Sequence, residues 1–100
     1  MKWTSSVRFK DLKPQLLLAA IRVDEIYKDI GFVCWITSAN DKNHTAPNSK
    51  HYTGEALDFR IFNIPVEKHE ELLDRVYTSL GIEYDVILEK DHLHVEYDPK

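Results

Sequence analysis

The sequence predicts an α+β domain in which helices pack on one side of a small, largely antiparallel sheet. Two stretches repeat apolar residues at the three- and four-residue spacing of an amphipathic helix. Other short stretches have the β-branched and aromatic composition, or the two-residue alternation, of strands. Their order along the chain is helix, strand, long loop, strand, helix and hairpin, and this order favours the α+β class.

The first predicted helix lies between Asp11 and Gly31. Asp11 is suited to cap it, Pro14 falls in the first turn, where a missing N–H costs little, and Gly31 ends it. Its apolar face follows spacings of four, three, four and three residues: Leu16, Ala20, Val23, Tyr27 and Ile30. The residues before Asp11 are expected to form an extended lead-in.

A short strand and a long loop follow this helix. Phe32 to Thr37 is β-branched and aromatic, which predicts a buried strand with Trp35 packed in the core. From Ser38 to Thr53 the apolar residues give way to polar ones, and no helical or strand period fits. A loop of this length in so small a domain is usually functional or disordered.

The second half of the chain predicts a strand, a helix and a hairpin. Ala56 to Ile61 reads as a strand that carries Asp58, and Pro65 opens a helix that ends at Gly81. The inner face of this helix is predicted to carry six residues: Val66, His69, Leu72, Leu73, Val76 and Leu80. Two strands joined by a tight turn are expected to end the domain: Glu83 to Glu89 and His92 to Tyr97.

Length and composition indicate an ordinary soluble domain, residues 1–100, that we expect to be a monomer. Thirteen basic and seventeen acidic side chains give a net charge of -4, and no basic stripe occurs, which argues against nucleic-acid binding. The single cysteine, Cys34, excludes an internal disulfide and is expected to be a buried thiol. No signal peptide or membrane-spanning run is visible, so we expect synthesis in the cytoplasm without membrane insertion.

Alternation in the last predicted strand separates an apolar face from a polar one. The apolar set is Leu93, Val95 and Tyr97, and the polar set is His92, His94 and Glu96. Because the apolar set should face the core, we expect both histidines to face away from it.

Two separated clusters of histidine and aspartate suggest a metal site. Zinc binds imidazole nitrogen and carboxylate oxygen, and catalytic zinc sites use three protein ligands and a water. His51, Asp58 and His94 supply three such ligands, and Gly54 can form the turn between the first two. We therefore predict one Zn²⁺ ion held by these three residues.

The same residues carry a resemblance to the M15 family of zinc peptidases. The pattern Ser-x-His-x-x-Gly-x-Ala-x-Asp from Ser49 to Asp58 is followed by Asp-His-x-His from Asp91 to His94. This family includes D-alanyl-D-alanine carboxypeptidases and phage L-alanyl-D-glutamate endolysins. The resemblance covers nearly the whole chain and implies a Hedgehog/DD-peptidase-like fold.

The resemblance also implies roles for individual residues. It identifies His51, Asp58 and His94 as zinc ligands, Asp91 as the general base and His92 as a group that stabilises the oxyanion. Glu89 competes with Asp91 for the role of base. The implied substrate is the peptide part of bacterial peptidoglycan, and a phage or prophage lysin, released to the cell wall through a separate pore, fits the missing signal peptide.

One departure from the family pattern concerns substrate binding. The family usually has an arginine soon after the strand that ends in Thr-Ser, whereas here Ala39, Asn40, Asp41 and Lys42 follow Thr37-Ser38. Lys42, Lys50 or Arg60 are candidates to replace it. A non-catalytic zinc or wall-binding module and a phage structural component are the alternative functions, and both cleavage sites, L-Ala–D-Glu and D-Ala–D-Ala, stay open.

Overall fold

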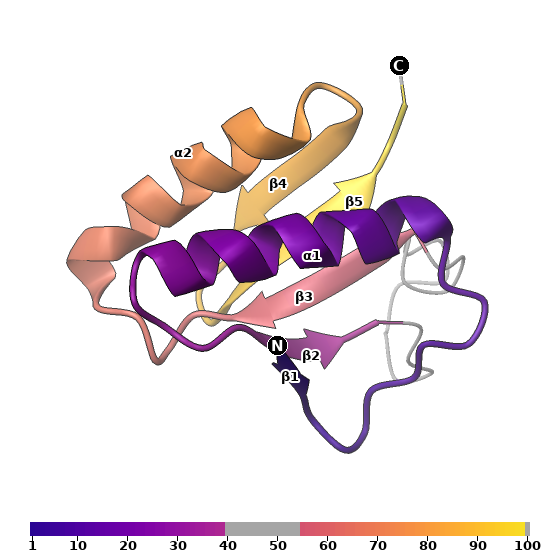
Figure 1. Cartoon of the computed structure of the whole chain (residues 1–100), viewed down its shortest axis with the longest axis horizontal. Coiled ribbons are helices and arrows are strands. Elements are labelled where there is room, and N and C mark those ends of the chain that lie inside the picture. The colour runs from indigo at the N-terminus through magenta and orange to yellow at the C-terminus, as the bar shows by residue number, and fades with distance from the viewer. Residues whose placement is uncertain (40–54, 100) are drawn as a thin grey trace.

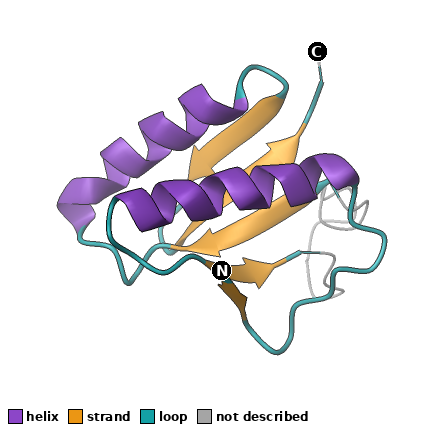
Figure 2. Ribbon diagram, in the orientation of Figure 1, coloured by secondary structure: helices purple, strands orange, loops and turns teal. Residues whose placement is uncertain are grey.

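The computed structural model describes residues 1–39 and 55–99, which form helices and strands joined by loops (Figure 2). In chain order the elements are β1 (Lys2–Trp3), α1 (Pro14–Asp29), β2 (Trp35–Ser38), β3 (Ala56–Arg60), the 3-10 helix η1 (Val66–Lys68), α2 (His69–Leu80), β4 (Tyr84–Leu88) and β5 (His92–Tyr97). This arrangement confirms the predicted α+β class.

The described strands form one five-stranded mixed sheet with the order β1-β2-β3-β5-β4. β1 pairs with β2 in parallel, and the other three pairings are antiparallel. Figure 1 shows α1 and α2 on the same side of this sheet. Side chains from both helices and from one sheet face form a single buried cluster, in which the largest are Tyr27, Phe59, Leu16, Leu57 and Ile61. The opposite face of the sheet is left without a helical layer in the described part of the chain.

The two ends of α1 differ in how well the sequence predicted them. Asp11 does not cap the helix: its backbone has a φ of 62°, and the N-cap is Lys13, which forms no side-chain capping bond. Pro14 occupies the first helical position as predicted. At the other end Gly31 has a φ of 93°, and the N–H of Phe32 donates to the carbonyl of Tyr27. This is the Schellman pattern, which glycine favours because it tolerates a left-handed backbone.

The start of the second helix was predicted one turn too early. Val66 lies in η1 and is 78% exposed, so it is not on the inner face. The tighter 3-10 turn eclipses side chains three residues apart and breaks the spacing that the later residues follow. From His69 onward the prediction is confirmed, because Leu72 and Val76 are fully buried. His69 itself is partly buried, and its Nε2–H donates to the carbonyl of Ile64 at 2.9 Å.

Cys34 is buried and free, as the sequence predicted. Burial, reinforced by the nearby charge of Asp24, raises the pKa of its thiol to about 12. The thiol is therefore neutral at physiological pH and behaves as a small apolar side chain.

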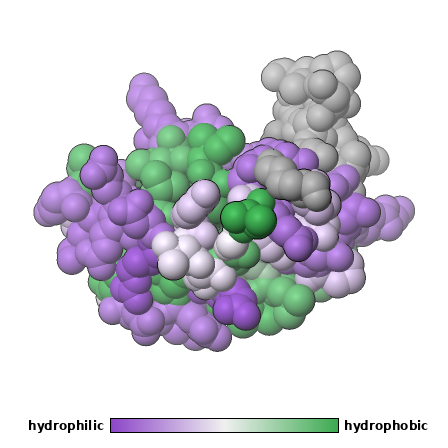
Figure 3. Space-filling model, turned by 90° about the horizontal axis from the view of Figure 1, so that it is seen from above, coloured by the Kyte–Doolittle hydropathy of each residue, from purple (hydrophilic) through white to green (hydrophobic). Residues whose placement is uncertain are grey.

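The surface seen from above in Figure 3 mixes hydrophilic and apolar side chains, with green patches interrupted by purple ones. In the described part of the chain no helix combines the length and hydropathy needed to cross a membrane.

Tyr27 of α1 forms a hydrogen bond with the last residue of β3. Its ring is fully buried, and its hydroxyl donates a hydrogen bond of 2.7 Å to the backbone carbonyl of Arg60. Burial raises the pKa of this hydroxyl above its ordinary value, so it remains a donor across the physiological range.

We expect Tyr27→Phe to lower the free energy of unfolding by about 1 kcal/mol, because the Arg60 carbonyl loses a buried donor. Denaturant unfolding measures the change. Tyr77→Phe is the matched control, since Tyr77 is 54% exposed. Equal stabilities of Tyr27→Phe and the unmodified protein would show that the bond contributes nothing.

Candidate metal centre

Asp58 of β3 and His94 of β5 are directly paired across the sheet. Side chains at paired antiparallel positions lie about 5 Å apart at their Cβ atoms and can interact. Both point away from the helices, because their sequence neighbours Leu57, Phe59 and Leu93 are fully buried in the core on the other side. The predicted alternation of β5 is thereby confirmed, and the candidate site lies on the sheet face that the helices leave uncovered.

His94 lies between two carboxylates. Its Nδ1 is 2.8 Å from Oδ1 of Asp58, and its Nε2 is 2.9 Å from Oε1 of Glu96. Asp58 is only 8% exposed. Burial acts to lower the pKa of His94, but the hydrogen bonds and charges of Asp58 and Glu96 outweigh it and raise the pKa to about 9. Without a metal, the imidazolium of His94 therefore neutralises the buried carboxylate of Asp58.

His92 faces three carboxylates from two edges of its ring. Nε2 lies 3.6 Å from Oδ1 of Asp58 and 3.8 Å from Oε1 of Glu89. On the other edge, Nδ1 lies 2.6 Å from Oδ1 of Asp91. The hydrogen bond from His92, together with its charge, holds the pKa of Asp91 below its usual value. Asp91 and Glu89, the two candidates for a base, thus flank the same imidazole.

Asp91 does not follow the alternation of β5, which would have directed it toward the core. It precedes the first residue of the strand, and its side chain is 79% exposed. Asp91 lies in the turn between β4 and β5, where the alternating side-chain directions of a strand do not apply.

Asp58, His92 and His94 form a group that could hold a metal ion. Each offers one ligand atom, and these atoms all lie within 4.8 Å of one another. Two imidazoles and a carboxylate are a common donor set for transition metals. Of the three ligands predicted from the sequence, Asp58 and His94 are brought together, whereas His51 falls among residues 40–54, outside the described residues. His92, predicted as a helper of catalysis, is close enough to be a ligand.

Glu96 also belongs to this site, although no role was predicted for it from the sequence. The alternation of β5 places it on the same face as His94, so the period of two was the available signal. It also belongs to an acidic group with Asp85 and Asp98 at the edge toward β4.

Trp35 was predicted to pack in the core, and this is wrong. Ile36 and Ser38 are the residues of β2 that are buried, while Trp35 is half-buried on the opposite face. The guanidinium carbon of Arg60 lies 4.5 Å from the centre of the Trp35 ring and 4.5 Å from that of Phe62. An uninterrupted apolar and aromatic run concealed the alternation of this short strand.

No protein-family model matches this chain, and no curated protein matches it either.

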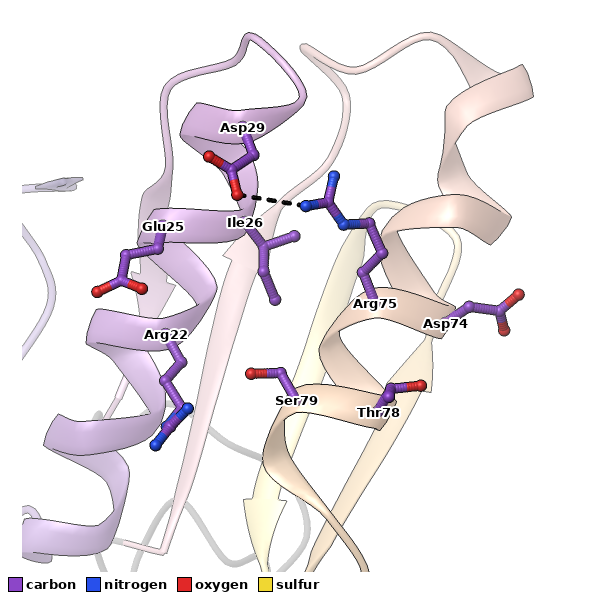
Figure 4. Close-up of a pocket in the computed structure, with 8 residues that line it drawn as sticks. All are labelled: Arg22, Glu25, Ile26, Asp29, Asp74, Arg75, Thr78 and Ser79. Carbon is purple, nitrogen blue, oxygen red and sulfur yellow. Dashed lines mark hydrogen bonds and ion pairs between the residues drawn. The ribbon is translucent and has the colours of Figure 1, made fainter.

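A charged cleft of about 500 Å³ lies between α1 and α2, in the helical layer rather than on the face of the candidate site (Figure 4). Arg75 crosses its mouth to within 3.3 Å of Asp29. Among the described residues, neither the predicted ligands Asp58 and His94 nor the predicted catalytic groups Asp91 and His92 line this cleft.

We expect the stability of the metal-free protein to fall as pH rises through the raised pKa of His94. The imidazolium is favoured in the folded state, so its contribution is complete below pH 6.5, the ordinary value, and is lost toward about pH 9. Denaturant unfolding with a chelator present, at several pH values in this window, measures the effect. His94→Gln should remove this part of the pH dependence, and parallel pH profiles for the two proteins would contradict the assignment.

Proposed function

We propose that this chain is a zinc-dependent peptidase that hydrolyses an amide bond in the peptide part of bacterial peptidoglycan. The observation that carries the proposal is the buried Asp58 carboxylate beside the imidazoles of His92 and His94, with further carboxylates at the edge of the group. The resemblance of the Ser49–Asp58 and Asp91–His94 motifs to M15 peptidases supports the choice of reaction. In the same proposal, the protein acts at the cell wall as a phage or prophage lysin.

Asp58 and His94 would hold the ion, with His51 as the third ligand that the sequence pattern implies. Bound zinc lowers the pKa of a water molecule to about 7 and polarises a carbonyl. The proximity of Asp58 to His94 supports this assignment, because a cation between them would replace the proton that they share in the metal-free protein.

A carboxylate beside the metal would take a proton from the attacking water and pass it to the leaving amine. Asp91 is the base that the sequence motif implies, and its lowered pKa keeps it in the ionised form that a base requires. Glu89 is the alternative, because its Oε1 lies near Nε2 of His92, the ring edge that also faces Asp58.

The contact between Asp91 and Nδ1 of His92 bears on the role of the imidazole. A hydrogen bond from Nδ1–H to the carboxylate fixes the tautomer and leaves Nε2 directed toward the metal group. Neutral His92 then presents a lone pair at Nε2, whereas protonated His92 presents an N–H that can stabilise an oxyanion. Substitution of His92 therefore distinguishes between its two possible roles, as a metal ligand or as a group that stabilises the oxyanion.

We expect the purified protein to bind one equivalent of Zn²⁺ and Asp58→Asn to weaken this binding by about 100-fold or more, because a carboxylate ligand becomes a poor amide ligand. Competition with a chromophoric chelator measures the affinity. Asp74→Asn, the same change in the α2 layer, is the control and should bind like the unmodified protein. His92→Gln should leave stoichiometric binding intact if His92 is a helper and weaken it strongly if it is a ligand.

We expect the zinc-loaded protein to release new amino termini from purified peptidoglycan, and mass spectrometry of the products to identify the bond. Asp91→Asn should lower kcat by about 10²- to 10⁴-fold while zinc binding persists, because only the proton transfer is lost. Glu89→Gln is the parallel variant, and the larger loss of the two identifies the base.

Activity that survives both chelation and Asp91→Ala would overturn the proposed mechanism. Stoichiometric zinc without hydrolysis of any wall preparation would instead favour a non-catalytic binding module. Asp74→Asn serves again as the control for the effect of losing one carboxylate.

A further inference from the structure

The two edges of the described sheet differ in how well they are protected against further strand pairing. β1 forms one edge with two residues, of which one is Lys2, and β4 forms the other with five residues (Figure 1). Proteins usually protect a sheet edge with a short strand, lysine, proline or a β-bulge. β4 contains neither lysine nor proline, and its register against β5 shows no shift. β4 is therefore the edge at which the described sheet can accept another strand.

The turn between β4 and β5 determines which backbone groups of β4 bond to β5. The N–H of Glu89 donates to the carbonyl of His92. Hydrogen-bonded and non-hydrogen-bonded pairs alternate along an antiparallel ladder, so Ile87 and Asp85 are the next residues of β4 that bond to β5.

The residues between these positions direct their backbone groups away from β5. The N–H and carbonyl groups of Val86 and Leu88 therefore lie along the outer edge of β4. The other end of the ladder follows the same pattern, because the carbonyl of Glu83 accepts from the N–H of Asp98. No described strand pairs with this outer edge. Such a row of donors and acceptors is a template for an extended peptide segment.

The side chains along this edge favour a basic partner. Four alternate residues share the sheet face that the helices leave uncovered: Glu83, Asp85, Ile87 and Glu89. Three of these four side chains are acidic and none is basic, and Ile87 is 46% exposed. An added strand would place its own side chains about 5 Å from them at the Cβ atoms. Opposite charges in such positions stabilise strand pairing, and like charges oppose it.

The same charges argue against a second copy of this chain at the edge. Two copies related by a two-fold axis would pair β4 with β4 in antiparallel orientation. In the register centred on Ile87, Asp85 of one copy lies opposite Glu89 of the other, and like charges directly opposite are destabilising. A segment with a basic residue two positions on either side of an apolar one fits this edge instead.

We propose that the outer edge of β4 binds an extended segment of a partner protein that carries basic residues at alternate positions around an apolar one. Its backbone bonds to the outward N–H and carbonyl groups of Val86 and Leu88. Its basic side chains lie beside Asp85 and Glu89, and its central apolar side chain lies beside Ile87. The outer edge is on the side of β4 away from β5 and β3, so this interaction does not depend on the proposed peptidase reaction.

The probe is the peptide acetyl-Thr-Lys-Val-Val-Val-Lys-Thr-amide, titrated into the full chain. Amide hydrogen exchange, followed by NMR, reports directly on the outward N–H groups. In the free protein the N–H groups of Val86 and Leu88 should exchange faster than that of Ile87, which bonds to β5. Saturating peptide should slow exchange at Val86 and Leu88 by about tenfold or more, because a hydrogen bond then protects them.

Two N-methylated forms of the peptide test whether the backbone is what pairs. Successive amides of an extended strand face opposite sides, so methyl groups on alternate amides block one edge of the peptide and leave the other free. One alternate set should abolish binding, and the other should preserve it. Val86→Pro is the matching change in the protein, since it removes an outward N–H without removing a bond to β5, and it should also abolish binding. The comparison of the two methylated peptides stands even if this variant fails to fold.

Charge variants test the match to a basic segment. Exchange of both peptide lysines for glutamate should weaken binding about tenfold or more, because two attractive pairs become repulsive. The double variant Glu83→Lys, Asp85→Lys should weaken binding of the lysine peptide and strengthen binding of the glutamate peptide. Glu70→Lys, Asp74→Lys makes the same change of net charge on exposed positions of α2. This control should bind both peptides like the unmodified protein.

Three results overturn the inference: no binding of the lysine peptide at millimolar concentration, equal binding of the two methylated forms, or a loss in the β4 charge variant no larger than in the α2 control. Protection of Val86 and Leu88 that appears without peptide as protein concentration rises, with a doubled mass in sedimentation, would also overturn it and assign the edge to a second copy. Hydrolysis of peptidoglycan is measured separately, so failure of the proposed function and failure of this inference are distinguishable.

Discussion

The antiparallel pairing of β3 with β5, in the register that sets Asp58 opposite His94, determines what both faces of the sheet can do. On one face it aligns Leu57, Phe59 and Leu93 with the helices, and their burial supplies the hydrophobic contribution to the fold. On the other face the same pairing gathers the carboxylate and imidazole groups. The same backbone hydrogen bonds between β3 and β5 therefore position both the core residues and the residues of the candidate site. A change in this pairing would move both groups.

On the polar face of this pairing, the burial of the Asp58 carboxylate costs free energy that a nearby cation must offset. A buried carboxylate without a partner is strongly unfavourable, and Asp58 is almost fully buried. In the metal-free protein the protonated ring of His94 provides the compensating charge, and Glu96 provides an acceptor for its second nitrogen. A metal cation would provide the same compensation from the same place. The site is thus suited to exchange a proton for a cation while Asp58 remains neutralised in both states.

The sequence was most informative where a residue pattern maps directly onto geometry. The period of two in His92–Tyr97 was sufficient to predict the strand and its two faces, and the ligand chemistry of the two clusters predicted the approach of His94 to Asp58. Local chemistry was less reliable. Asp11 had the side chain of a cap but not its backbone position, and Val66 preceded the regular helix by one 3-10 turn. Whether a short apolar run alternates depends on its tertiary surroundings, which is why Trp35 was misplaced.

The pairing of His92 with Asp91, and of His94 with Glu96, could not have been predicted from spacing alone, because a side chain chooses among several neighbouring partners in three dimensions. His51 lies outside the described residues, and the sequence motif alone assigns it a role as a ligand.

The strict alternation of β5 determines what a register error between β5 and β3 would do to the protein. A slip of β5 by one residue against β3 would turn His92 and His94 into the core and expose Leu93 and Val95 to water. Such a molecule would lose its hydrophobic layer together with its cluster of polar groups. A folded but misregistered form, stable enough to persist yet unable to assemble the cluster, is therefore disfavoured by the fold itself. Molecules that reach the native state should be uniform at this site.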